Sequence, residues 1–140
     1  MVDGKDCFCK GEGKVRIIYA CAGASNVGQL SNDVAVELTR RGEGRMGCLV
    51  GLAANVSTMV QNAKAADSLL VIDGCGVACA RKVLEGKGLI PDSMILTEMG
   101  VDKDYDLTAG KDRVHQLATK VTDGLDKSIN IITPGKGCGL

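Results

Sequence analysis

Cysteine is the residue type in this sequence with the widest chemistry, because its thiolate binds metal ions and also acts as a nucleophile. The chain has 140 residues and seven cysteines. Cys75 and Cys79 lie four residues apart, just after the apolar run at residues 69–72. Cys21 and Cys48 lie at or near the ends of two earlier apolar runs. The first question is therefore whether these four thiols meet.

The expected compartment limits what the thiols can do. No apolar run approaches the roughly 18 residues of a membrane span, and residues 1–14 are polar, so neither a membrane anchor nor a signal peptide is expected. We therefore predict a cytoplasmic protein. Because the cytosol keeps thiols reduced, an odd number of cysteines there indicates metal ligation or thiol chemistry more than disulfides.

Composition excludes several classes of partner. Seventeen basic residues balance seventeen acidic ones, so the chain lacks the overall positive charge typical of proteins that bind nucleic acids or anionic membranes. We expect neither partner, and the oligomeric state stays open. The chain has three aromatic residues, one Phe and two Tyr, so its core must be aliphatic.

The pattern of apolar residues predicts alternating strands and helices. The expected strands are residues 15–20, 46–50, 69–73, 94–97 and a short last one at 130–133. Helical spacing of apolar residues predicts helices over about residues 27–41, 56–63, 76–85 and 112–127, with a loop at 101–110. We read residues 1–14 as a flexible leader, 15–133 as one domain and 134–140 as a loose tail.

This alternation is typical of an α/β fold with a three-layer, doubly wound, mostly parallel sheet of four to five strands. Right-handed crossovers favour a flavodoxin-like or Rossmann-like sheet with strand order 2-1-3-4. In such sheets ligands collect outside the carboxyl ends of the strands, where the strand order reverses. The fold would therefore place residues that follow different strands at one common edge.

That edge is where the four cysteines are expected to converge on a metal ion. Neighbouring strands lie about 4.8 Å apart, and the sulfurs of a tetrahedral zinc site lie about 3.8 Å apart. Cys21 and Cys75 each follow a strand, and Cys79 would share a helix face with Cys75. Cys48 fits least well, because inside a strand over residues 46–50 its sulfur would point into the core unless that strand ends early.

Four segments in order resemble the DGC domain family, named for the motif that here is Asp73-Gly74-Cys75. They are residues 18–29, 46–52, 71–82 and 96–100. The resemblance implies that residues 15–133 form a DGC-like domain. It also implies a zinc site with ligands matching Cys21, Cys48, Cys75 and Cys79. It implies no reaction.

Other functions stay open at this point. Four thiolates suit an iron–sulfur cluster nearly as well as zinc. Residues 21–26 look like the cysteine loops of phosphotransfer proteins and small phosphatases, so Cys21 is a candidate nucleophile for phosphoryl or thiol transfer. However, Val27 and Gly28 stand where the phosphatases carry an arginine. A thiol–disulfide or redox protein using Cys75 and Cys79 is a third reading.

Further residues have modest expected roles. Ser25 or Asn26 could meet a small anionic ligand in the crevice between the first and third strands, although helix capping is the stronger expectation. Asp73 could bond backbone N–H groups or act as a base, and shaping an Asp-Gly turn is favoured. His115 is expected at the surface. No role is assigned to three cysteines near the chain ends, namely Cys7, Cys9 and Cys138.

Overall fold

The computed structural model describes residues 14–125, and within them four strands form one parallel sheet. The sheet order is β2-β1-β3-β4. The strands are β1 Arg16–Ala20, β2 Arg45–Met46, β3 Ser68–Asp73 and β4 Asp92–Ile95. The predicted α/β class and the strand order 2-1-3-4 are therefore confirmed. The expected strand at 130–133, the leader except for residue 14, and the tail lie outside the described residues.

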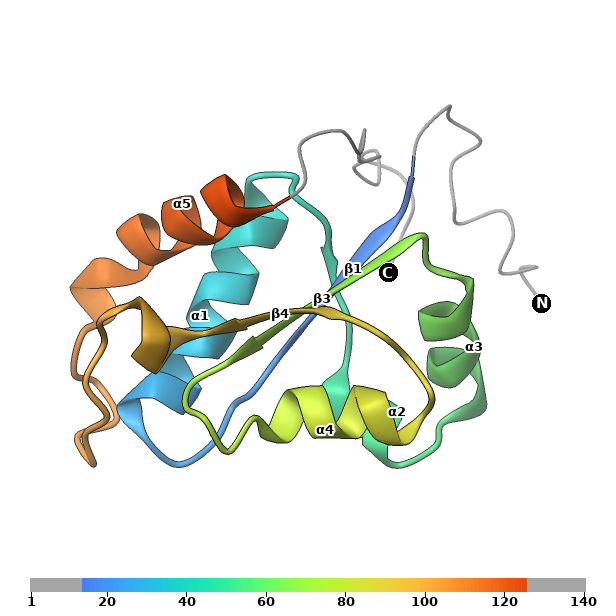
Figure 1. The fold of residues 1–140 in the computed structure, drawn as a ribbon, viewed down its shortest axis with the longest axis horizontal. Coiled ribbons are helices and arrows are strands. Elements are labelled where there is room, and N and C mark those ends of the chain that lie inside the picture. The colour runs from blue at the N-terminus through green and yellow to red at the C-terminus, as the bar shows by residue number, and fades with distance from the viewer. Residues whose placement is uncertain (1–13, 126–140) are drawn as a thin grey trace.

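Helices cover both faces of the sheet (Figure 1). One face packs against α1 Asn26–Arg40 and α5 Val114–Gly124. The other packs against α2 Leu49–Ala53, α3 Ser57–Ala65 and α4 Cys79–Gly86. Short 3-10 helices follow β4 at Leu96–Met99 and precede α5 at Lys111–Arg113. None of the helices in residues 14–125 is both long and apolar enough to cross a membrane.

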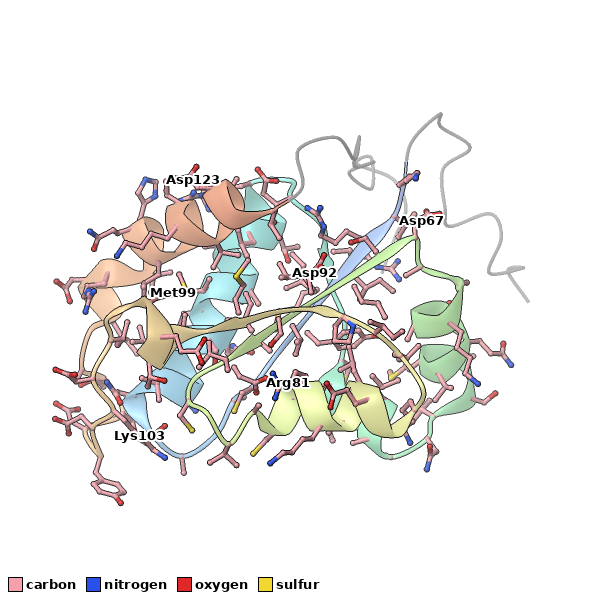
Figure 2. All side chains as sticks on the ribbon, viewed as in Figure 1. Asp67, Arg81, Asp92, Met99, Lys103 and Asp123 are labelled. Carbon is pink, nitrogen blue, oxygen red and sulfur yellow. The ribbon has the colours of Figure 1, made fainter. Side chains whose placement is uncertain are left out.

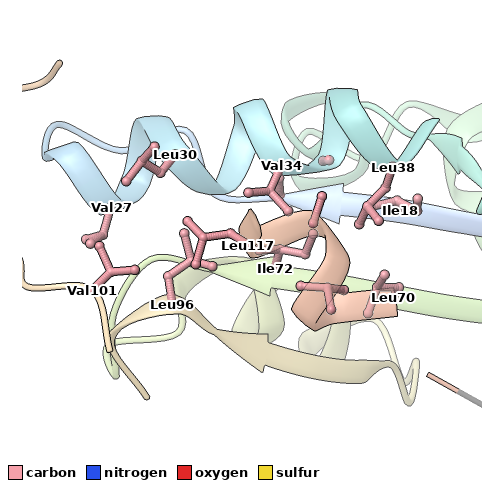
Figure 3. Close-up of a cluster of buried hydrophobic side chains, with 14 of the residues drawn as sticks. Ile18, Val27, Leu30, Val34, Leu38, Leu70, Ile72, Leu96, Val101 and Leu117 are labelled. Carbon is pink, nitrogen blue, oxygen red and sulfur yellow. The ribbon is translucent and has the colours of Figure 1, made fainter. Parts of the chain in front are cut away.

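Because both faces are covered, every residue of β1 is buried, and so is β3 beyond its first residue. Successive side chains alternate between the two faces. Ile18 and Ile72 join the aliphatic cluster beneath α1 and α5, which Figure 3 shows. Ile17 and Val71 join the cluster beneath α2, α3 and α4. By the same alternation, the side chain of Cys21, which follows β1, lies on the side of Ile17.

The second strand differs from the prediction. It ends at Met46, so the expected strand over residues 46–50 is wrong, and Leu49 starts α2 instead. A short apolar run fits a buried strand and a buried helix equally well by periodicity, which explains the error. Because β2 ends at Met46, Cys48 is not held inside a strand with its sulfur pointing into the core. It lies beyond the strand and is exposed.

Three other boundaries differ from the prediction. The helix expected from residue 76 begins at Cys79, because Ala78 adopts a left-handed conformation with φ of 53°. The strand expected at 94–97 runs over Asp92–Ile95, and a 3-10 helix takes its last residues. The helix expected at 112–127 is α5, with a 3-10 turn before it.

The end of α1 is fixed to α5 by a charged cluster. Arg41 bonds the carbonyl oxygen of His115 at 2.9 Å and the hydroxyl oxygen of Thr119 at 3.0 Å. Glu37 accepts hydrogen bonds from Arg40 and Arg41, and these two guanidinium groups lower the pKa of its carboxyl group to about 2. The His115 side chain is 80% exposed, which confirms its expected surface position.

Glu37 should therefore make stability depend on pH in the acid range. Its folded pKa lies below the ordinary value of 4.5, so its contribution is complete above that value and is lost as the pH falls toward 2. Glu37→Gln should flatten that part of the pH profile of the unfolding free energy, measured by urea denaturation. Glu98→Gln, at an exposed position outside this cluster, should keep the wild-type slope. An unchanged slope in Glu37→Gln would contradict the assignment.

Candidate cysteine site at the carboxyl edge of the sheet

The four cysteines of residues 14–125 all lie at the carboxyl edge of the sheet. Cys21 directly follows β1, Cys48 follows β2 by two residues and Cys75 follows β3 by two residues, while Cys79 is the first residue of α4. Figure 2 shows sulfur atoms at this edge, between the start of α1 and the start of α4. Cys48 and Cys79 are exposed, whereas Cys21 and Cys75 are half-buried.

Cys21 extends the pairing of β1 with β3 by one residue, since its N–H donates to the Ile72 carbonyl oxygen at 3.0 Å. The alternation of β1 turns its side chain to the α4 side, where it packs against the second cluster. Its sulfur accepts a hydrogen bond from the Gly23 N–H at 3.3 Å. The Ser31 hydroxyl donates to the Cys21 carbonyl oxygen at 2.9 Å and fixes the backbone.

The surroundings of Cys21 favour its neutral thiol. Burial raises the pKa of this thiol above its ordinary value, and the N–H groups of Gly23 and Gly74 oppose that rise only in part. The negative charges of Asp73 and of a Cys79 thiolate raise the pKa of Cys21 further. A raised pKa is the opposite of what a nucleophile for phosphoryl transfer needs.

Asp73 is the residue that fixes the start of α4 next to Cys21. Its side chain is buried, and its two oxygens accept hydrogen bonds from the N–H groups of Ala80 at 2.8 Å and Arg81 at 3.1 Å. It therefore satisfies free N–H groups of the first helical turn. The sequence favoured a turn-shaping role for Asp73, and the structure shows the alternative, a carboxylate that bonds backbone N–H groups.

Replacing Asp73 should loosen α4 at the end that carries Cys79. Asp73→Ala removes both acceptors and should lower the free energy of unfolding by about 0.5–2 kcal/mol, the range typical of a lost helix cap. Asp92→Asn, at an exposed position of β4, should stay within about 0.5 kcal/mol of wild type. Urea denaturation measures both. Equal stability of the two variants would show that the two bonds to α4 contribute little.

Cys48 caps the short helix α2. Its sulfur accepts a hydrogen bond from the Gly51 N–H at 3.3 Å. It also lines a cleft of about 380 Å³ beside the ends of β1 and β2, together with small and apolar residues such as Ala22 and Leu49. The sulfur is thus reachable from solvent while its backbone is fixed by a helix.

Cys75 lies on the opposite side of the sheet from Cys21. It packs against the cluster beneath α1 and α5, and the Lys103 ammonium lies 3.8 Å from its sulfur. Figure 2 labels Lys103 on the loop that follows the 3-10 helix Leu96–Met99. Gly74, which connects β3 to Cys75, packs its backbone against that of Val27 at the start of α1.

Asn26 holds the loop that carries Lys103. The Asn26 amide nitrogen donates to the Asp102 carbonyl oxygen at 2.9 Å, and its amide oxygen accepts from the Asp104 N–H at 2.6 Å. The Asn26 N–H donates to the Asp104 carbonyl oxygen at 3.1 Å. Ser25 caps α1 by accepting from the Gly28 N–H, as expected. Both residues therefore have structural partners.

The sheet edge brings the four cysteines to one end of the molecule without assembling them. Cys21 and Cys79 belong to the α4 side and Cys75 to the α1 side. Among residues 14–125, no three His, Cys, Asp or Glu side chains lie close enough together to hold a metal ion. The donors themselves suit zinc, because they are soft sulfur ligands and two of them already accept backbone N–H groups. Gathering all four would require the segment 74–78 to move.

Lys103 is a site residue that the sequence did not single out, and Asn26 was expected to cap a helix or meet an anion but not to hold a distant loop. Asn26 bonds Asp102 and Asp104, the residues on either side of Lys103, which lie 76 and 78 positions further along the chain. An Asn at the start of a helix indicates a cap, and nothing local indicates a clamp on a distant loop. Asp104, next to Lys103, carried no signal beyond an acidic loop.

Comparisons with known proteins agree with these motifs. The family model described as "DGC domain" matches residues 17–121. The chain is 33% identical over 120 residues to a Pseudomonas aeruginosa protein named "Anaerobic and virulence modulator AnvM", covering 85% of this chain and 86% of that protein. No solved structure matches.

Proposed function

This chain belongs to the DGC domain family, and from that premise we propose that it is a metal-binding protein with a structural, sensory or redox role. The metal is zinc. Its ligands are the four cysteines at the carboxyl edge of the sheet, Cys21, Cys48, Cys75 and Cys79. We place the protein in the cytoplasm, where thiols stay reduced.

The observation that carries the proposal is the common position of four sulfurs from three separate parts of the chain. Each lies at the carboxyl edge, after a strand or at the start of a helix. The N–H groups of Gly23 and Gly51 already donate to Cys21 and Cys48. Zinc binds cysteine in its thiolate form.

Assembly of the site requires Cys75 to leave Lys103 and cross toward Cys21. The segment 74–78 has features that suit this movement. An added Cβ on Gly76 would meet no atom within 4 Å, and Val77 is 54% exposed. Ala78 is in the left-handed region, which costs a non-glycine residue about 1–2 kcal/mol that a new backbone conformation can release.

A site with four sulfur ligands leaves no open position, which favours a structural or sensory role over catalysis by the metal. The P. aeruginosa relative is named as a modulator, which supports a regulatory role of this kind. The raised pKa of Cys21 disfavours the alternative in which Cys21 is the nucleophile of a phosphoryl transfer. An iron–sulfur cluster is the alternative that the same ligands could hold.

Metal content of purified variants tests the ligand assignment. The full chain, purified without oxygen, should carry one zinc per chain and be colourless, and Cys75→Ser should lose stoichiometric zinc. Cys138→Ser is the matched control, and it should keep the wild-type content. Equal zinc in both variants would exclude Cys75 as a ligand. A brown wild-type protein with iron and sulfide would replace zinc with a cluster.

A further inference from the structure

We infer that Cys21 and Cys79 form a reversible disulfide with each other when the protein meets a low-molecular-weight disulfide such as oxidised glutathione. The sequence pointed instead to Cys75 as the partner of Cys79, because the two lie four residues apart. The fold packs Cys75 against the cluster beneath α1 and α5, whereas Cys21 and Cys79 both lie on the α4 side of the sheet. The inference does not rest on metal binding.

Asp73 is the structural link between the two sulfurs. Cys21 lies beside the end of β3, since its N–H bonds the Ile72 carbonyl oxygen and its sulfur faces the α4 side. The next residue of β3, Asp73, bonds the N–H groups of Ala80 and Arg81. Cys79 immediately precedes Ala80. Ala80 is fully buried, and it belongs to the cluster against which Cys21 packs. Cys21 and Cys79 therefore flank one carboxylate.

The electrostatics agree with this placement. A negative charge on Cys79 is close enough to raise the pKa of Cys21, as is the charge of Asp73. Cys75, in contrast, packs against the other cluster and contacts Lys103. In the metal-free chain no metal ion draws Cys75 away from Lys103, so a Cys75–Cys79 disulfide would first have to break that contact.

The exposures of the two sulfurs set the order of the steps. Cys79 is exposed and Cys21 is half-buried, so the Cys79 thiolate attacks the small disulfide, forming a mixed disulfide and releasing one glutathione thiolate. The Cys21 thiolate then attacks the Cys79 sulfur, which forms the internal disulfide and releases the second glutathione. Two protein thiols are oxidised and one glutathione disulfide is reduced to two glutathione thiols, which take up the two protons that the protein thiols lose.

A disulfide needs Cα atoms within about 7 Å. The loop before Cys79 can supply the adjustment, because Gly76 has open space around it and Ala78 is in a strained conformation. Asp73 would keep α4 in place while Cys79 turns toward Cys21. Both cysteines are also proposed metal ligands. Of the four proposed ligands, the oxidised chain would therefore keep free thiols at Cys48 and Cys75 alone.

The test treats the full chain, freed of metal by a chelator, with oxidised glutathione and maps the products by peptide mass spectrometry. The wild type should give an internal Cys21–Cys79 disulfide that a reductant reverses. Cys21→Ser should stop at a mixed disulfide between Cys79 and glutathione, and Cys79→Ser should form no internal disulfide with Cys21. Cys75→Ser should form the internal disulfide to the wild-type extent. Far-UV circular dichroism confirms that each variant is folded.

Two results would overturn the inference. One is a wild-type disulfide that maps to Cys75 and Cys79. The other is a wild type that yields mixed disulfides alone, with no internal bond. The zinc content of the untreated wild type is measured separately. The disulfide mapping can therefore be interpreted even if the protein contains no zinc. A chain without zinc could still form the disulfide, and a zinc protein could fail to form it after metal removal.

Discussion

Gly74→Ala is expected to lower the free energy of unfolding by about 1–3 kcal/mol, the usual cost of forcing an extra methyl group into a packed interior. A Cβ at residue 74 would lie 2.6 Å from the Val27 carbonyl carbon and 2.7 Å from the Gly28 nitrogen. Both are backbone atoms of α1, so they cannot turn aside as a flexible side chain would. The end of β3 and the start of α1 would have to separate.

Gly76→Ala is the matched control for that substitution. It makes the same chemical change on the other side of Cys75, where an added Cβ meets no atom within 4 Å and the backbone φ is not positive. Its stability should stay within about 0.5 kcal/mol of wild type. Urea denaturation of the two variants gives the comparison. If both variants are as stable as wild type, the tight contact between Gly74 and Val27 is not a feature of the folded protein.

Asn26→Ala is expected to lower the free energy of unfolding by about 1–3 kcal/mol, because it removes two hydrogen bonds made by a buried side chain. The Asn26 side chain bonds the Asp102 carbonyl oxygen and the Asp104 N–H, and it is 3% exposed. Without it, the loop that carries Lys103 keeps a single backbone bond to residue 26. Amide hydrogen exchange of residues 102–104 should become faster.

Asn32→Ala is the control on the same helix. Asn32 is half-buried, and its side chain makes none of the hydrogen bonds found in residues 14–125. Alanine also favours the helix, so this variant should be as stable as wild type or slightly more stable. Unchanged exchange at 102–104 in Asn26→Ala would show that Asn26 does not hold the loop.

Much of the fold could be predicted because its signals are local. The β-branched apolar runs gave β1 and β3, and their alternation with amphipathic helices gave the parallel sheet and its order. Boundaries failed where one side chain decides them. Cys48 ends the extended segment by capping α2, and Asp73 together with the left-handed Ala78 delays α4 to Cys79. Neither is visible in the periodicity of apolar residues.

The sequence predicted the edge of the sheet at which the cysteines lie, but not how their side chains are arranged there. Parallel strands put their carboxyl ends at one edge, so Cys21 and Cys75 were correctly expected there, whereas Cys48 lies there because β2 ends earlier than predicted. The side of the sheet on which each sulfur lies depends on contacts between distant segments. Gly74 against α1 and Lys103 on its clamped loop hold Cys75 away from Cys21. Such contacts leave no local trace in a single sequence.

The central claim is that four cysteine sulfurs bind one zinc ion. X-ray absorption at the zinc edge of the full chain, purified without oxygen, tests it most directly. Four cysteine ligands should give four sulfur neighbours at about 2.3 Å and none of the shorter bonds, near 2.0 Å, that nitrogen or oxygen ligands make. A zinc shell with two or fewer sulfurs, or a wild-type protein that holds no metal, would contradict it.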